Sequence, residues 1–277
     1  MIMDRHLLIV STIFFFAAVV RSVIALRARV FRRSRFNFVM IALGFALQTM
    51  FLSVRGHAVG RCPITNLFEV LVFLAWSIAL IYMLVGPAYR LSLMGVFTAP
   101  LVLLLQLFAL LAPVDTPHAI RVMPNPWLEF HASISIIAYG VFALACVAGA
   151  MYLVQERQLK THELRSIFYH LPPLPTLFSA MTRLLWLGFA LYTAGLISGF
   201  FTGEPVPWIK VVLAVAIWVL YGAILQGRHL RSFTPRRIAA LCVGRLLRRF
   251  RCCGALNSLP ITRETFLYRA QSSHRAN

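Results

Sequence analysis

The sequence is poor in charge, and above all in negative charge. Charged residues make up 13% of the 277 residues, and only 8 acidic side chains face 27 basic ones. A soluble domain usually has about 25% charged and about 45–50% apolar residues, whereas this chain is 60% apolar. This composition argues against a water-soluble enzyme.

Several motifs are also missing. There is no CxxC or CxxCH pair among the five cysteines, no P-loop and no GxGxxG. These absences argue against a disulfide framework, a c-type cytochrome and a nucleotide-binding enzyme. No carboxylate pair or nucleophile–base pair emerges either, so we expect no enzyme, no catalytic residue and no separate metal-ion site.

Long apolar runs are what the sequence does have. A helix that crosses a bilayer needs about 20 mostly apolar residues, and seven runs qualify, at 7–26, 37–54, 65–86, 91–112, 127–154, 184–201 and 208–226. An eighth run near 238–251 is broken by arginines, which predicts a basic amphipathic helix on the inner surface. We therefore predict an all-α polytopic transmembrane bundle over 1–227, followed by a basic, partly disordered cytoplasmic tail over 228–277.

The arginines and lysines predict the orientation of the bundle. They concentrate after the first, third, fifth and seventh spans, whereas few lie in the alternate loops. Basic residues favour the cytoplasmic side, so the amino terminus is predicted outside and the tail inside. The excess of positive charge thus reports topology and contact with membrane lipid, and we expect no nucleic-acid partner.

Ionisable groups within spans are the first site candidates. Glu69 lies four residues into the third span, and His131 lies four residues past Trp127, which suits the outer aromatic belt. Both are predicted about 6 Å below the outer surface, where they could face one another. His57 and His118 lie in the outer loops above.

The fifth span carries small and polar residues at helical spacing: His131, Ser135, Tyr139, Phe142, Cys146 and Gly149. One interpretation is a seam between helices, and the other is an imidazole offered to haem iron or a metal. Gly195 and Gly199 form a GxxxG, which predicts close packing within the chain or between copies of it. A homo-oligomer therefore stays open.

The largest inner loop, 155–183, combines a polar stretch with the sequence HLPPLP at 170–175. We expect a surface helix followed by a rigid connector. A docking site for a cytoplasmic partner is the alternative interpretation.

Three segments carry a resemblance to a known family. RGHAVGRCPITNLFEVLVFLAW (55–76), WLEFHASISIIAYGVFALACVAGAMYLVQERQLK (127–160) and WVLYGAILQGR (218–228) resemble signatures of cytochrome c assembly membrane proteins of the CcsA/ResC/HemX type. The match covers about 55–230. It includes Pro63, Thr65, Asn66, Phe68, Glu69, Phe73, Trp127, Leu128, His131, Tyr139, Tyr152, Leu153, Gln155, Glu156, Leu159 and Lys160.

The resemblance implies a haem-handling protein of c-type cytochrome biogenesis in the bacterial inner membrane. It implies haem as cofactor, other cytochrome c assembly proteins as partners, and His131 as a haem ligand, with His57 and His118 as further candidates. Glu69, Trp127, Tyr139, Trp208 and Lys210 are implied as supporting residues, and Gln226 and His229 as candidates on the inner side.

The sequence departs from the family in three places, at the tryptophan-rich segment, at Gln226, where many members have a histidine, and at the eighth span. The tryptophan-rich segment before the seventh span is reduced to Pro-Trp-Ile-Lys at 207–210, and an arginine-rich stretch replaces the eighth span. The first departure fits the HemX branch, so a membrane regulator or adaptor of tetrapyrrole synthesis is an alternative function. A small-solute transporter is a second alternative, although neither repeated halves nor paired intramembrane charges are visible.

Overall fold

Helices account for nearly all of the chain that the structure describes. The computed structural model describes residues 2–27, 35–60, 62–88, 94–111, 125–161, 173–203, 206–229, 236 and 238–241. The long helices are α1 Ile2–Arg27, α2 Arg35–Val59, α3 Leu67–Ala88, α4 Met94–Leu111, α5 Pro126–Thr161, α6 Leu174–Phe200 and α7 Trp208–His229. Each contains a stretch long and apolar enough to cross a bilayer. The predicted class, a polytopic transmembrane helix bundle, is confirmed.

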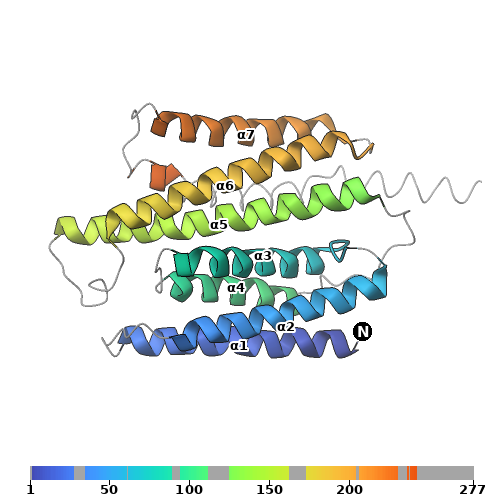
Figure 1. Ribbon diagram of the computed structural model, residues 1–277, viewed down its shortest axis with the longest axis horizontal. Helices are drawn as coiled ribbons and strands as arrows, with labels where there is room; N and C mark the ends of the chain where they lie inside the picture. Colours follow the sequence, from blue (N-terminus) through green and yellow to red (C-terminus); the bar gives the residue numbers. More distant parts are fainter. Residues whose placement is uncertain are drawn as a thin grey trace, which may run out of the picture.

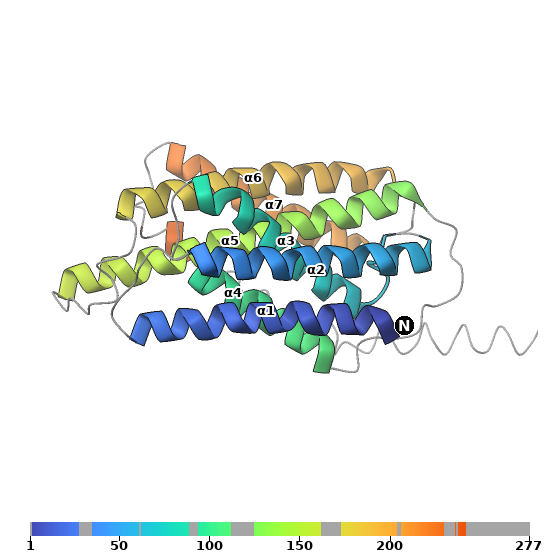
Figure 2. The ribbon, with the colours of Figure 1, turned by 60° about the horizontal axis from the view of Figure 1, so that its bottom comes forward.

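The helices lie side by side and run alternately in opposite directions (Figures 1 and 2). One end of the bundle holds the start of α1, the turn between α2 and α3, the start of α5 and the junction of α6 with α7. We call it the His131 end; it is the end that the sequence predicts to face outward. The opposite end, where α5 finishes and α6 begins, is called the Glu156 end.

The bundle has two groups of helices, α1–α4 and α5–α7, which meet where α3 packs against α5. Their backbones approach closely at Gly140. A methyl group there would lie 2.9 Å from the Ser77 Cβ and 3.3 Å from the Ile78 backbone nitrogen. Only glycine fits at this contact without a shift of one helix.

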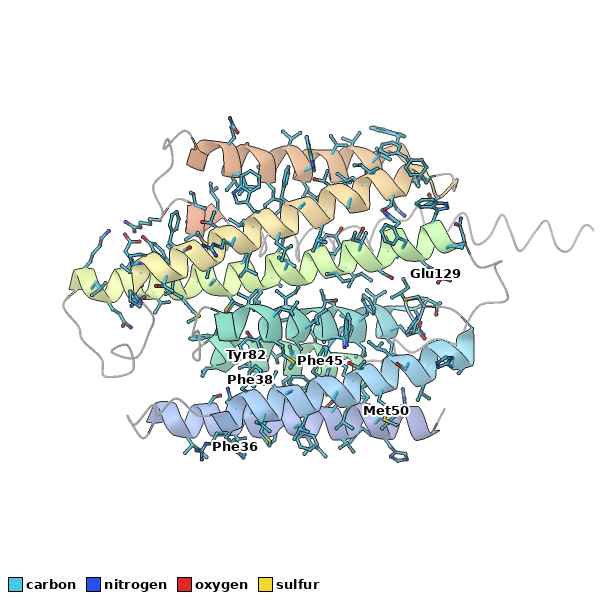
Figure 3. All side chains as sticks on the ribbon, in the orientation of Figure 1. Phe36, Phe38, Phe45, Met50, Tyr82 and Glu129 are labelled. Carbon is cyan, nitrogen blue, oxygen red and sulfur yellow. The ribbon has the colours of Figure 1, made fainter. Side chains whose placement is uncertain are left out.

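Aromatic rings fill the space between α2 and α3. The rings of Phe45 and Trp76 are stacked with centroids 5.6 Å apart, and those of Phe38 and Tyr82 are 6.4 Å apart (Figure 3). Met50 on α2 is 54% exposed, which suits a helix with one face toward lipid. The apolar faces therefore divide into protein-facing and lipid-facing positions, as expected for a membrane bundle.

The inner loop 155–183 is shorter than the sequence predicted. Helix α5 continues to Thr161, and α6 begins at Leu174, ten residues before the predicted start. Pro173 is the N-cap of α6, and a further proline lies in its first turn. Prolines fit there because the first turn of a helix has no use for their missing N–H. The prediction of a rigid connector through residue 175 was therefore wrong at its carboxyl end, and residues 162–172 lie outside the described chain.

The start of the predicted basic segment, residues 238–241, packs against the bundle. Ile238 and Ala239 are 1% and 0% exposed. A methyl group on Gly149 of α5 would lie 3.5 Å from the Ala239 carbonyl oxygen and 3.3 Å from the Met181 sulfur. The missing side chain of Gly149 thus makes room for this contact. Residues 242–251 lie outside the described chain.

Candidate functional site

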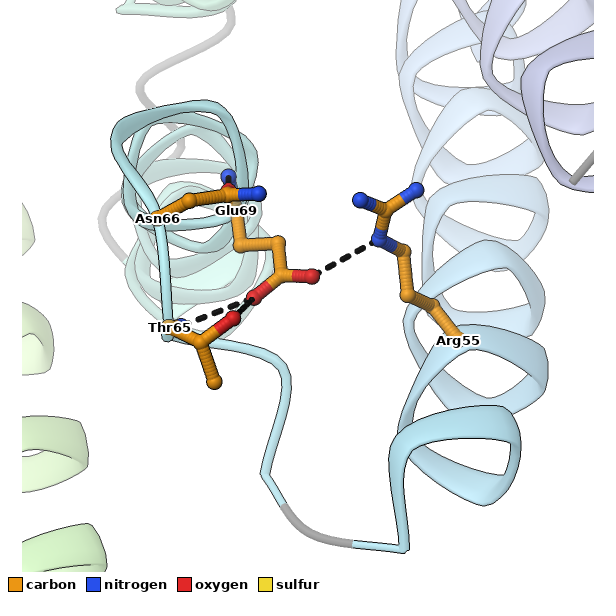
Figure 4. Close-up of polar contacts among 4 residues, drawn as sticks. All are labelled: Arg55, Thr65, Asn66 and Glu69. Carbon is orange, nitrogen blue, oxygen red and sulfur yellow. Dashed lines mark hydrogen bonds and ion pairs between the residues drawn. The ribbon is translucent and has the colours of Figure 1, made fainter. Parts of the chain in front are cut away.

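A buried ion pair joins α2 to α3 at the His131 end. The Arg55 Nε donates to Glu69 Oε1 at 2.7 Å, and the two side chains are 4% and 0% exposed (Figure 4). The Arg55 guanidinium also lies 5.1 Å from the centre of the Phe68 ring. A buried carboxylate needs such a partner, because an unpaired charge in an apolar surrounding is strongly unfavourable.

Thr65 and Asn66, which precede α3, both form hydrogen bonds with Glu69, and these bonds explain why the motif has a threonine and an asparagine here. The Asn66 Oδ1 accepts the Glu69 backbone N–H at 2.9 Å, which caps the first turn of α3. The Thr65 backbone N–H and hydroxyl both donate to Glu69 Oε2 at 2.7 Å. Glu69 therefore closes a reciprocal capping arrangement and pairs with Arg55 at the same time.

The loop that carries Cys62 ties this cluster to α5. The Cys62 backbone N–H donates to Glu129 Oε2 at 3.2 Å, and its sulfur lies 3.5 Å from the Ser133 hydroxyl. Figure 3 labels Glu129 at this end of α5. Burial raises the pKa of the Cys62 thiol above its ordinary value, the hydrogen bond with Ser133 lowers it, and the charges of Glu129 and Glu69 raise it. The thiol is therefore protonated at neutral pH.

His131 points to α6. Its Nδ1 lies 2.7 Å from the Gly195 carbonyl oxygen and 3.4 Å from the Ser198 hydroxyl. Since a carbonyl oxygen can only accept, the proton is on Nδ1. For the other ring nitrogen, Nε2, the described part of the chain provides no hydrogen-bond partner. This is the arrangement in which a second group fixes the tautomer of a ligating imidazole.

The GxxxG of α6 makes room for the imidazole. A methyl group on Gly199 would lie 3.1 Å from Cε1 and 3.2 Å from Nδ1 of His131, and one on Gly195 would lie 2.8 Å from the Ser135 hydroxyl. Farther along, a methyl group on Gly188 would meet the Phe142 ring at 2.8 Å. The predicted stripe of small and polar residues on α5 therefore packs against α6 and forms a seam between the two helices. His131 is the residue of this stripe that lies nearest the end of the bundle.

Aromatic side chains surround this end of the seam. The rings of Trp127 and Phe201 are 5.3 Å apart, and the two residues are 52% and 60% exposed. Trp208, at the start of α7, is 73% exposed, and Lys210 is exposed as well. Deeper in the seam, Tyr139 packs against Tyr192 at 6.1 Å between ring centres. Exposed aromatic side chains thus lie at the end of the bundle that carries the imidazole.

Glu69 and His131 do not interact, so the expectation that they face one another was wrong. Their depths are similar, but their directions around the bundle differ. Glu129 and Ser133 turn toward the Cys62 loop, and residues two positions apart on a helix point about 200° apart. His131, midway between them in sequence, therefore points away from that loop and toward α6.

The structure places the other candidate residues apart from His131 or leaves them undescribed. His57 is exposed in the last turn of α2, and Gln226 is exposed near the opposite end of the bundle, on α7. His118 lies outside the described residues, and so does the side chain of His229. Sequence reasoning missed Arg55 as the partner of Glu69. The sequence did contain a signal for this pair: Glu69 is an acid inside an apolar span, and Arg55 precedes the short loop that leads into that span.

Comparison with known proteins agrees with these motifs. Residues 64–244 match the family model described as "Cytochrome C assembly protein". The chain belongs to this family. Its matched region spans α3 to α7 and includes Glu69 and His131, so the resemblance that the sequence carries is confirmed.

Individual relatives within and near the family are similar over most of their length. The cytochrome c biogenesis protein CcsA of Guillardia theta is 26% identical over 222 residues, which cover 70% of this chain and 72% of that protein. CcsA of Prochlorococcus marinus strain MIT 9303 is 27% identical over 262 residues, with 80% and 81% covered. Protein HemX of Brevibacillus brevis is 26% identical over 206 residues, with 71% and 75% covered.

Proposed function

We propose that this membrane protein handles haem during c-type cytochrome biogenesis and that His131 supplies an axial ligand near the outer face. The observation that carries the proposal is the fixed ring of His131. Its Nδ1–H is committed to the Gly195 carbonyl at 2.7 Å, so Nε2 is the atom available to iron. Imidazole nitrogen is a common axial ligand of haem.

The surroundings of His131 suit a flat apolar ligand with charged edges. Trp127 and Phe201 offer partly exposed rings beside it, and the exposed Lys210 provides a cation for a carboxylate. The buried acid at this end of the bundle, Glu69, is paired with Arg55. When bound, the haem would supply redox-active iron; the chain's own residues would bind it, orient it and shield it from water.

The proposed setting is the bacterial inner membrane, with the His131 end outside and the basic tail in the cytoplasm. Other cytochrome c assembly proteins are the proposed partners, because the family's name and its CcsA relatives concern that process. The chain itself is assigned no catalytic step in this proposal.

A HemX-like role as membrane regulator or adaptor of tetrapyrrole synthesis is the second candidate. It is favoured by the similarity to Protein HemX of Brevibacillus brevis. The two functions differ in whether the purified chain carries haem.

The test is the absorption spectrum of the detergent-purified full chain. We expect a Soret band that His131→Ala removes or shifts to shorter wavelength. His6→Ala is the matched control, because His6 lies near the start of α1 at the same end of the bundle and is exposed. Both variants are compared at equal abundance in the membrane fraction. A Soret band that is unchanged in His131→Ala would make His131 a packing residue, and a pure chain without haem would favour the adaptor.

A further inference from the structure

The Glu156 end contains a basic pocket that the proposed function does not use. Its volume is about 370 Å³, and it is lined by Leu153, Glu156, Arg157, Lys160 and Arg236. The four residues from α5 follow the spacing i, i+3, i+4 and i+7, which places them on one face of the helix. We call this site the inner basic pocket.

The acid in the pocket contacts two of the three cations. The Lys160 Nζ donates to Glu156 Oε1 at 2.7 Å, and the Arg236 Nε lies 4.0 Å from Glu156 Oε2. These contacts use a minority of the N–H donors that a lysine and an arginine carry. With three cations and one carboxylate, the pocket keeps a net positive charge and donors for an anion.

Arg236 reaches this site from the chain after α7, and its side chain is 68% exposed. The residues that follow it, Ile238 and Ala239, are buried in the bundle, where Ala239 packs at Gly149 of α5. Gly149 lies one turn before Leu153 on the same side of the helix. The chain after α7 is therefore anchored so that Arg236 comes to the face of α5 that carries Glu156 and Lys160.

The depth of the pocket matches the headgroup layer of the bilayer. Helix α5 has 36 residues, and its second residue is the exposed Trp127, a residue type that lies at headgroup level. A bilayer with its headgroups is about 40–45 Å thick, which corresponds to about 27–30 helical residues. Counted from Trp127, the outer edge of the opposite headgroup layer lies near Val154 to Arg157, at the level of the pocket.

We propose that the inner basic pocket binds the phosphate headgroup of an anionic phospholipid. Arg157, Lys160 and Arg236 surround the phosphate, and Leu153, on the membrane side of the charged residues, contacts the start of the acyl chains. Basic pockets beside transmembrane helices on the cytoplasmic side recognise such headgroups. This inference is independent of haem binding, because it concerns the opposite end of the bundle.

Retention of lipid by the purified full chain tests the proposal. Native mass spectrometry would compare phosphatidylglycerol with phosphatidylcholine of the same acyl chains. We expect preferential retention of phosphatidylglycerol, reduced about five-fold by Arg236→Gln. Arg236→Lys should keep most of the preference, since it keeps the charge. Lys160→Gln provides a second test within α5, and thermal unfolding verifies that the variants fold.

Arg21→Gln is the matched control. It removes one positive charge at the same end of the bundle, where Arg21 is exposed on α1, but outside the pocket. An equal loss in Arg21→Gln and Arg236→Gln would show unspecific charge attraction and overturn the proposal. Equal retention of the two lipids would overturn it too. Displacement of the lipid by millimolar inorganic phosphate would identify free phosphate as the ligand in place of a lipid.

Discussion

Replacing Glu69 by glutamine should destabilise the bundle far more than the same replacement of Glu156. Glu69 is completely buried and pairs with an arginine that is 4% exposed. Removing one partner of a buried pair costs about 3–5 kcal/mol, because the other charge loses its counter-ion. Glu156 pairs with Lys160, which is 61% exposed, and an exposed i, i+4 pair contributes only about 0.3–0.5 kcal/mol.

Thermal unfolding of the detergent-purified chain, followed by tryptophan fluorescence, measures the difference. With about 2–4 °C per kcal/mol for chains of this size, Glu69→Gln should lower Tm by about 10 °C and Glu156→Gln by about 1–2 °C. Adding Arg55→Met to Glu69→Gln should recover part of the loss, since no unpaired buried charge would remain. Equal shifts in the two single variants would refute the assignment of a buried, mutually dependent pair.

Two further predictions concern the same end of the bundle. Gly199→Ala should lower the free energy of unfolding by about 1–3 kcal/mol, because its methyl group would crowd the His131 ring. Gly222→Ala is the control: its methyl group would lie 3.6 Å from its nearest neighbour, so Tm should stay unchanged or rise. Melting curves compare the two variants, and equal losses of stability would contradict the close packing of α5 against α6. Cys62 should react slowly with iodoacetamide at pH 8, because its raised pKa leaves little thiolate, and faster as the pH rises. Glu129→Gln should speed the reaction at fixed pH by removing a negative charge, measured with the other cysteines replaced by serine; an unchanged rate would contradict this electrostatic contribution.

Hydropathy predicted the seven spans because each must satisfy its backbone hydrogen bonds internally and present apolar side chains to lipid. It placed the start of α6 too late, because Pro173 and Pro175 read as helix breakers, although prolines are compatible with a first turn. It also cut α5 at its last apolar residue, whereas the helix continues through charged residues beyond the hydrocarbon. The length of an apolar run therefore predicts the membrane-spanning segment, whereas the helix that contains this segment can be longer.

The sequence predicted how deep Glu69 and His131 lie in the membrane, but not which neighbouring helix each side chain faces. Counting residues placed Glu69 and His131 at the same level, yet the rise per residue says nothing about which neighbour a helix face meets. That depends on the packing of α5 between α3 and α6. The stripe from His131 to Gly149 did predict a seam, because small residues at helical spacing favour close packing. Its partner, α6, became apparent only in the structure.

The close approach of α3 and α5 at Gly140 limits the routes that a large molecule can take along this protein. A space that cannot hold one added methyl group cannot admit a porphyrin. A porphyrin could therefore pass between α3 and α5 at the level of Gly140 only if these two helices first moved apart.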